Sequence, residues 1–342
     1  MKKNICESIL DAIGNTPLVK LKKISAGTDL NILVKIEYFS PSGSLKDRIL
    51  LRIIENAEKR GKLKKGMTLI EGTTGNTGIS TSMIGAVKGY KVIICMPAGM
   101  SEERKKVMRA YGAEIIETPG AESDVDLVLK QVKKIIREDS SKYFFVNQFN
   151  NKENLVAHYT TTAKEIWKQT NGELDAFIAS QGTGGTISGV GKLLKKKNPS
   201  IKVYAIEPAE CPLLSQRKWG SHRIEGIGDG FIPRVLDVSL LDGIVTTTSN
   251  ESIEMAKRLA KEEGIFCGIS SGCNVAGVLK LYKKHPELKT IVTMINDNGF
   301  RYFSTALCGE EKELEIPERE HPMDAYTQKN LDKHQSKWEI IN

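Results

Sequence analysis

The eight residues from Pro41 to Arg48 place a lysine in an unusual setting. Turn-forming residues end the extended segment before them, and Ser44 has the spacing of a helix N-cap, with Asp47 three residues on. The pattern therefore predicts that Lys46 lies in the first turn of a helix that runs to about Arg60. The helix dipole disfavours a positive charge there by roughly 0.3–1 kcal/mol. It favours the neutral amine, which is the nucleophile that forms a Schiff base. Taken alone, however, a lysine at such a place is more often a solvated surface charge.

The segment Glu71–Gly78 is a candidate anion site. It follows a predicted strand, opens a predicted helix, and contains Thr73, Thr74, Asn76 and Thr77 between glycines. Small residues let backbone N–H groups and hydroxyls converge on an anion at a helix N-terminus, and a carboxylate or a phosphate would both fit. The alternative is an ordinary turn rich in glycine and threonine.

A third loop has the composition of a phosphate cradle. It lies between a predicted strand and a predicted helix and consists of Gly182, Thr183, Gly184, Gly185 and Thr186. A dinucleotide-binding G-x-G-x-x-G motif would need glycine at position 187, which is isoleucine. A P-loop would need a following Gly-Lys-Ser/Thr, which the sequence lacks. The loop therefore favours a monophosphate.

A fourth turn, Gly268–Gly272, supplies neutral hydroxyls, among them Ser270, although serines are common at helix N-caps. Four loops at strand–helix junctions, with one amine among them, suggest a cofactor that carries an aldehyde and a monophosphate. Pyridoxal 5′-phosphate (PLP) carries both groups, and its aldehyde can react with Lys46.

The elements that must position these loops alternate along the chain. Helix-length amphipathic stretches such as Glu102–Tyr111, Ser123–Glu138 and Ser252–Glu263 lie between apolar, strand-like runs. We predict strands at Ile32–Ile36, Thr68–Glu71, Val92–Met96, Glu114–Glu117, Tyr143–Val146, Asp175–Ala179, Val203–Glu207 and Thr290–Ile295. This alternation predicts an α/β fold, with parallel sheets that carry helices on both faces.

We expect two α/β domains with the ligand between them, because ligands in such folds bind beyond the carboxyl ends of the strands. The large domain would comprise residues 1–40 and 151–310, and the small domain residues 41–150. Residues 311–342 are polar, rich in Glu, Lys and Pro, and show no strand pattern. We expect them to form a C-terminal extension that wraps around the protein or partly frays.

The bulk composition excludes several classes of protein. The chain has 342 residues, 40% of them apolar, and its net charge of +8 comes from scattered lysines with acidic residues between them. Aromatic residues make up only 6%, so a nucleic-acid-binding stripe is not indicated. The cysteines and histidines lack metal-ligand and disulfide spacing, and Cys95 and Cys267 are expected in the core. Without a signal-peptide core or an apolar run of membrane-spanning length, we expect a cytoplasmic protein with no metal and no membrane contact.

With these motifs, the chain resembles the cysteine synthase / cystathionine β-synthase family of fold-type-II PLP enzymes. The resemblance runs from about Ile9, in the segment Asp11–Leu18, to about Thr305. It rests on the patterns P-x-G-S-x-K-D-R, T-x-G-N-T-G, N-Q-F, G-T-G-G-T, G-I-G-x-G-F-I-P and G-I-S-S-G, which occur in the family's order. The family implies a tryptophan synthase β-like fold with PLP in the cleft between the two domains.

The resemblance also implies roles for single residues. Lys46 would hold the internal aldimine and later move protons at the substrate Cα. Asn76 would bind the ring hydroxyl oxygen, Gly182–Thr186 the phosphate, and Ser270 the pyridine nitrogen. The substrate carboxylate would be held by Thr73, Thr74, Thr77 and Gln148.

The reaction that the family implies is β-replacement on a three-carbon L-amino acid through an aminoacrylate. Because serine cannot protonate the pyridine nitrogen as an aspartate can, Ser270 would leave the ring a weaker electron sink. This suits loss of a β-leaving group better than transamination. The small domain would be mobile and would close over the substrate carboxylate to exclude water.

The chain departs from the family pattern at a few positions. Thr74 stands where serine is usual, Ser180 and Gln181 replace small apolar residues, and Asp229 stands where cysteine synthases usually have alanine. A Gly-Asp-Gly stretch is also good turn chemistry. The functional alternative is that Asp229 acts as a general base toward water or a thiol, or repels an anionic nucleophile.

Three functions are therefore open. The first is cysteine synthase, which makes cysteine from O-acetylserine and sulfide. The second consumes cysteine, releases hydrogen sulfide and adds water or a second thiol, in the manner of cystathionine β-synthase. That enzyme's larger relatives carry a haem site and a regulatory tail, which are not expected here because Cys6 has no nearby histidine. The third is a non-catalytic binding protein. The resemblance further suggests a homodimer that binds serine acetyltransferase.

Overall fold

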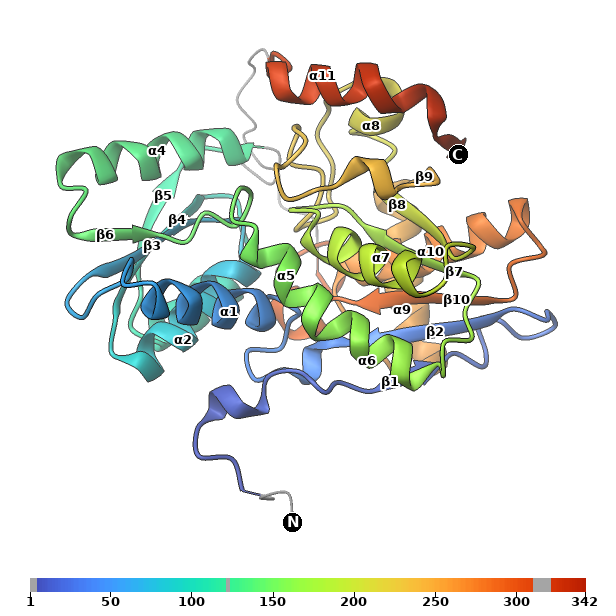
Figure 1. Ribbon diagram of the computed structural model, residues 1–342, viewed down its shortest axis with the longest axis horizontal. Coiled ribbons are helices and arrows are strands. Elements are labelled where there is room, and N and C mark those ends of the chain that lie inside the picture. Colours follow the sequence, from blue (N-terminus) through green and yellow to red (C-terminus); the bar gives the residue numbers. More distant parts are fainter. Residues whose placement is uncertain (1–4, 121–123, 310–320) are drawn as a thin grey trace.

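The computed structural model describes residues 5–120, 124–309 and 321–342 and contains two sheets (Figure 1). The larger sheet has the strand order β1 (Leu18–Lys20), β2 (Asn31–Ile36), β10 (Thr290–Ile295), β7 (Ala176–Ser180), β8 (Lys202–Pro208), β9 (Gly243–Thr247) and β11 (Glu339–Ile341). Its strands pair in parallel except for β1 and β2. The smaller, all-parallel sheet has the order β5 (Glu114–Thr118), β4 (Lys91–Pro97), β3 (Thr68–Gly72) and β6 (Tyr143–Phe145).

Helices cover both faces of each sheet. The larger sheet packs on one face against α9 (Ser249–Glu263) and α10 (Ile269–Lys284), and on the other against α6 (Thr162–Gln169) and α7 (Gly185–Lys197). The smaller sheet packs on one face against α1 (Lys46–Lys59), α2 (Asn76–Lys88) and α3 (Glu102–Ala110), and on the other against α4 (Val125–Glu138). Strands buried on both faces have continuous apolar runs, and the predicted α/β fold and all eight predicted strands are confirmed.

The C-terminal segment differs from the prediction. Residues 311–320 lie outside the described part, but residues 325–334 form helix α11 (Ala325–His334) and the chain ends in strand β11. β11 pairs in parallel with β9, and Trp338 is buried in the core cluster to which residues of α7 also belong. The sequence shows no strand pattern in this segment, so strand β11 was not predicted. Three residues are too few to show a strand pattern, and the pairing with β9 defines the strand.

Other details bear on the expectations from composition. Cys95 and Cys267 are fully buried, as predicted. In the described part of the chain, no helix combines the length and apolar character needed to cross a membrane. Within the same residues, no group of three His, Cys, Asp or Glu side chains could hold a metal ion. The boundaries of the two domains stay a prediction.

Candidate active site

A cavity that is partly open to solvent lies where loops from the two sheets meet. Its walls come from the loop after β3 and the start of α1 on one side, and from the starts of α7 and α10 on the other. All of the predicted site residues except Gly185 line it, namely Lys46, Thr73, Thr74, Asn76, Thr77, Gln148, Gly182, Thr183, Gly184, Thr186, Asp229 and Ser270. Residues from segments more than 200 positions apart in the chain thus face one space.

Lys46 is the first residue of α1, as predicted, but the helix begins differently from the prediction. Leu45 is the N-cap and makes no side-chain cap bond, whereas Ser44 Oγ accepts a 3.3 Å hydrogen bond from Lys46 N. The Asp47 carboxylate accepts hydrogen bonds from Ser42 N (2.7 Å) and Ser80 Oγ (2.6 Å). The predicted capping box is therefore wrong, because more distant donors hold Asp47.

The loop after β3 is bonded to the segment that carries Gln148. Thr77 Oγ1 donates to Gln148 Oε1 at 2.6 Å, and Gln148 Nε2 donates to the Gly72 carbonyl at 3.3 Å. Thr73 Oγ1 accepts a 3.0 Å bond from Gly75 N and so shapes the turn. Neutral hydroxyls and an amide therefore gather at the N-terminus of α2, where an anion is favoured.

Asn76 is held by two residues that the sequence did not reveal. Its Nδ2 donates to Asp297 Oδ2 at 2.7 Å, and its Oδ1 accepts from Arg301 Nη1 at 3.0 Å. Arg301 also donates to the carbonyls of Ser42 and Gly43 in the turn before α1. One buried arginine thus fixes both the amide of Asn76 and the turn that precedes Lys46.

The loop before α7 fits a phosphate. Gly184 has φ +78°, and a Cβ at Gly182 would lie only 2.3 Å from the Gly226 carbonyl oxygen, so glycine is required at both places. The first backbone bond of α7 runs from Ser188 N to Gly184 O at 3.0 Å. Residues 185–187 come before this first bond, so their N–H groups lie at the N-terminus of the helix, where helices bind anions. Lys46 and Arg104 are the cations that line the cavity in the described chain, so neutral donors form the cradle itself.

Ser270 lies in the first turn of α10, which begins at Ile269. Asn296 Nδ2, at the end of β10, donates a 3.0 Å hydrogen bond to Ser270 Oγ. Since the Ser270 oxygen accepts this bond, its own hydroxyl hydrogen can turn toward the cavity. The serine is therefore suited to donate to an unprotonated pyridine nitrogen.

Asp229 is buried in the cavity wall, with 9% of its surface exposed. It lies between Gly228 (φ +72°) and Gly230 (φ +78°), so it belongs to a tight turn as one interpretation expected. Burial raises the pKa of its carboxyl group to about 7, while the charge of nearby Lys46 acts in the opposite direction. A carboxyl group with this pKa can accept a proton near neutral pH.

Two further charged residues at the cavity were not predicted. Arg104 on α3 forms an ion pair with Glu225, which precedes the Gly226–Gly230 turn. The arginine is 2% exposed, and its guanidinium carbon lies 4.5 Å from the centroid of the Tyr302 ring. The pair joins the two sides of the cavity. Its partners stand 121 positions apart, so no local spacing could indicate it.

Comparison with known proteins identifies the class. The family model described as "Pyridoxal-phosphate dependent enzyme" matches residues 9–297. A cysteine synthase of Staphylococcus aureus is 44% identical over 302 residues, which is 88% of this chain and 96% of the relative. The chain therefore belongs to the family of PLP-dependent enzymes, and within it to the cysteine synthase group of fold type II.

Solved structures agree with this assignment. A hydrogen sulfide-producing enzyme from Fusobacterium nucleatum is 44% identical, with a TM-score of 0.83 over 87% of this chain and 100% of the other. A cysteine synthase from Entamoeba histolytica is 40% identical, with a TM-score of 0.85 over 99% and 98% of the two chains. The protein is thus a PLP-dependent enzyme that replaces a group on the β-carbon of an amino acid.

Proposed function

We propose that this enzyme is a cysteine synthase, which converts O-acetyl-L-serine and hydrosulfide into L-cysteine and acetate. The observation that supports this best is the composition of the cavity. One amine, Lys46, lies opposite neutral donors for a carboxylate, a glycine-rich phosphate cradle and the serine hydroxyl of Ser270.

The residues present fit PLP. Residues 182–186 would hold its phosphate, Ser270 its pyridine nitrogen, Asn76 its ring oxygen, and Lys46 Nζ its aldehyde carbon. When bound, the cofactor supplies an electron sink conjugated to the substrate Cα.

The remaining steps fall to side chains of the protein. Hydroxyls of Thr73, Thr74 and Thr77 and the amide of Gln148 would bind and orient the substrate carboxylate. Lys46 would take the proton from Cα, so that acetate leaves Cβ, and would return it after hydrosulfide has added. Ser270 donates a hydrogen bond without delivering a full proton, which limits charge build-up on the ring and favours elimination over transamination.

A second candidate function starts from cysteine. Cysteine and water would give serine and hydrogen sulfide, and cysteine with a thiol would give a thioether and hydrogen sulfide. Two observations favour this candidate, namely the Asp229 carboxyl with its pKa raised to about 7 and the likeness to a hydrogen sulfide-producing enzyme. Asp229 would remove the proton from the incoming water or thiol.

Product analysis separates the two candidates. The holoenzyme is incubated with O-acetyl-L-serine plus sulfide, and separately with L-cysteine alone, and the products are identified by mass spectrometry. We expect cysteine and acetate from the first mixture. Failure to form cysteine there, together with steady sulfide release from the second mixture, would reject the cysteine synthase proposal in favour of the second candidate.

The Asp229→Asn variant tests the proposed base. If Asp229 takes the proton, sulfide release from cysteine should fall by roughly 10²–10⁴-fold in the variant. In the wild type, the rate should rise as pH increases through about 7, because the ionised carboxylate is the active form. The matched control is Asp139→Asn, which alters an exposed aspartate after α4. Unchanged sulfide release and an unchanged product distribution in Asp229→Asn would leave Asp229 as a turn residue.

Several broader features belong to the same proposal. We expect a homodimer, in which residues 41–150 close over the bound substrate, and a protein that binds the C-terminal peptide of serine acetyltransferase in the active-site cleft. All six cysteines are unpaired, which supports a reducing compartment such as the cytoplasm. Gel filtration with light scattering tests the homodimer.

A further inference from the structure

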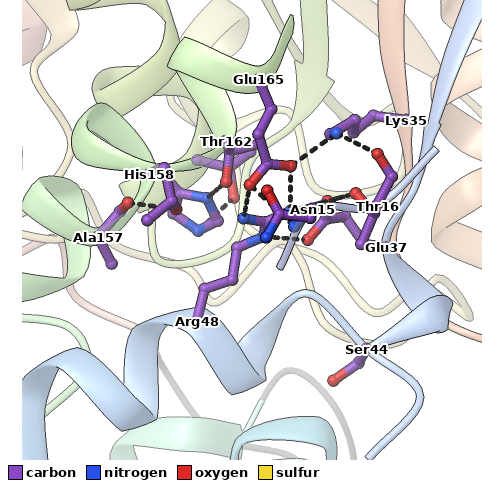
Figure 2. Close-up of polar contacts among 12 residues, drawn as sticks. Asn15, Thr16, Lys35, Glu37, Ser44, Arg48, Ala157, His158, Thr162 and Glu165 are labelled. Atoms are coloured by element: carbon purple, nitrogen blue, oxygen red, sulfur yellow. Dashed lines mark hydrogen bonds and ion pairs between the residues drawn. The ribbon is translucent and has the colours of Figure 1, made fainter. Parts of the chain in front are cut away.

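A buried network of ion pairs surrounds Arg48, two residues after Lys46 on α1 (Figure 2). Its carboxylates are Glu37, in the short helix η2 (Glu37–Phe39), and Glu165 of α6, and its second cation is Lys35 of β2. The side chains of Lys35, Glu37 and Arg48 are 0–1% exposed, and that of Glu165 is 16% exposed. Two cations and two carboxylates balance in charge, which is what makes such deep burial tolerable.

Arg48 uses its whole guanidinium group in this network. Nε and Nη2 donate to the two oxygens of Glu37 at 2.6 and 2.9 Å, and Nη1 and Nη2 donate to the two oxygens of Glu165 at 2.7 and 2.8 Å. Nη2 also donates to Thr16 Oγ1 at 3.1 Å. A planar fork held between two carboxylates leaves the arginine no freedom to rotate.

The segment Gly14–Thr16, part of the motif near the N-terminus, is shaped around this arginine. Gly14 has φ +92°, and a Cβ there would lie 2.9 Å from Arg48 Nη1. Asn15 N donates to Glu165 Oε1 at 3.0 Å, and Thr16 Oγ1 donates to Glu37 Oε1 at 2.7 Å. The motif therefore packs against the network and does not line the cavity.

The network adds a tertiary anchor to the start of α1, where the local capping bond runs from Lys46 N to Ser44 Oγ at 3.3 Å. Leu45 makes no side-chain cap bond, and the first turn carries the unfavourable charges of Lys46 and Arg48 near the positive end of the helix dipole. The carboxylates of Glu37 and Glu165 neutralise one of these charges and tie the turn to η2, which directly follows β2, and to α6. α1 is thus held by elements of the larger sheet, on which the phosphate cradle also stands.

A neutral histidine lies between the network and the cradle. His158 of α5 (Glu153–Thr160) is fully buried, and its Nε2 lies 3.2 Å from Thr186 Oγ1 while its Nδ1 lies 3.0 Å from Thr162 Oγ1. Burial, and to a smaller extent the charges of Arg48 and Lys46, hold the pKa of His158 well below its usual value. The first turn of α1 and the phosphate loop are therefore near neighbours across one buried side chain.

We propose that Arg48, clamped by Glu37 and Glu165 and enclosed by Gly14–Thr16, is a positioning residue that fixes Lys46 at the distance from the phosphate cradle that cofactor capture needs. The proposal rests on the proposed role of Lys46 in binding PLP. Lys46 is attached to a rigid turn and has to reach the aldehyde of a cofactor whose phosphate is held by another loop. A small displacement of α1 would therefore slow the formation of the lysine–cofactor bond.

The test compares Arg48→Lys with Lys35→Met. The first variant keeps the charge but loses the fork, whereas the second removes a buried cation from the same network without touching α1. The apoenzyme of each is mixed with PLP, and the rate of lysine–cofactor bond formation is followed by visible absorbance. We expect Arg48→Lys to slow this rate on the order of 10- to 100-fold and Lys35→Met to leave it near that of the wild type, although both lower the melting temperature.

A second readout does not depend on the cofactor. Hydrogen exchange of the apoenzyme should become faster at the amides of residues 50–54 in Arg48→Lys, and not in Lys35→Met. Two results would overturn the positioning role. In the first, Arg48→Lys binds the cofactor and exchanges its amide hydrogens at the rates of the wild type. In the second, Arg48→Lys and Lys35→Met slow the formation of the lysine–cofactor bond equally. If exchange changes as expected but wild-type Lys46 forms no bond with PLP, the proposed function fails and the anchoring of α1 stands.

Discussion

At the scale of single residues, buried carboxyl groups hold the site together without touching a ligand. Glu71, at the end of β3, is 0% exposed, and its Oε1 accepts a 3.1 Å bond from Gly72 N. Burial raises the pKa of Glu71 to about 8, while the backbone N–H groups of residues 72, 147 and 148 lower it. Glu71 is therefore protonated near neutral pH, at the point where β3 passes into the loop that lines the cavity.

The Glu71→Gln variant tests this protonation state. In the unfolded chain the carboxyl group ionises near 4.5, whereas in the folded protein it ionises at about 8. Its stabilising contribution is therefore complete below about 4.5 and is lost as the pH rises toward 8. Because glutamine does not titrate, the free energy of unfolding of the variant, relative to the wild type, should rise by on the order of a few kcal/mol between pH 5 and 8.

Denaturant unfolding at several pH values measures this difference, and Glu55→Gln, an exposed change on α1, is the matched control. The same pH dependence in Glu71→Gln and in the wild type would contradict a protonated Glu71. Glu207 also has a pKa raised to about 7 by burial, and its effect cancels in the comparison because it is present in both proteins.

At the scale of elements, the C-terminal segment completes the larger sheet. β11 pairs with the edge of β9, and Leu331 and Trp338 belong to the core cluster on the α7 face of the larger sheet. Trp338 is 7% exposed. Because these side chains are buried in a packed core, we expect the segment to contribute to stability.

We expect Trp338→Ala to lower the free energy of unfolding by about 3–5 kcal/mol, since it leaves a large cavity in a packed core. Val87→Ala, a truncation of a side chain that is 46% exposed, should cost less than about 0.5 kcal/mol. Urea unfolding measures both. Equal, small losses in the two variants would show that the C-terminal segment does not belong to the cooperative core.

The buried strands were predictable because they are continuous apolar runs, and the cavity loops were predictable because each carries its own spacing of glycines and hydroxyls. β1, β9 and β11 were not predicted. Helix α9 begins at Ser249, three residues before the predicted start, because Thr248 and Glu251 form a capping box. Arg104 and Glu225, which line the cavity, could not be found from the sequence, because tertiary packing alone brings them there. The same holds for Asp297 and Arg301, which hold the amide of Asn76.

At the scale of the whole molecule, the ion pair of Arg104 and Glu225 connects α3, beside the smaller sheet, to a turn of the larger one. Removing one partner of a buried ion pair lowers the free energy of unfolding more than removing both, because it leaves an uncompensated buried charge. In a double-mutant cycle with Arg104→Met and Glu225→Gln, we therefore expect a coupling on the order of 1–3 kcal/mol.

The exposed pair of Arg258 and Glu262 on α9 serves as the reference for this cycle. Its coupling should lie between about 0 and 1 kcal/mol. Thermal unfolding of the wild type, the two single variants and the double variant of each cycle measures the coupling. Additive effects at Arg104 and Glu225 would mean that the pair does not tie the two sides of the cavity together.

The central claim is that Lys46 binds the cofactor in the cavity between the two sheets. Reduction of the holoenzyme with borohydride, followed by proteolysis and mass spectrometry, tests it most directly, because reduction makes the lysine–cofactor bond permanent. We predict that the cofactor's mass is found on the peptide that contains Lys46 and is absent from a Lys46→Ala variant. Modification of a different lysine in the wild type, or of none, would contradict the claim.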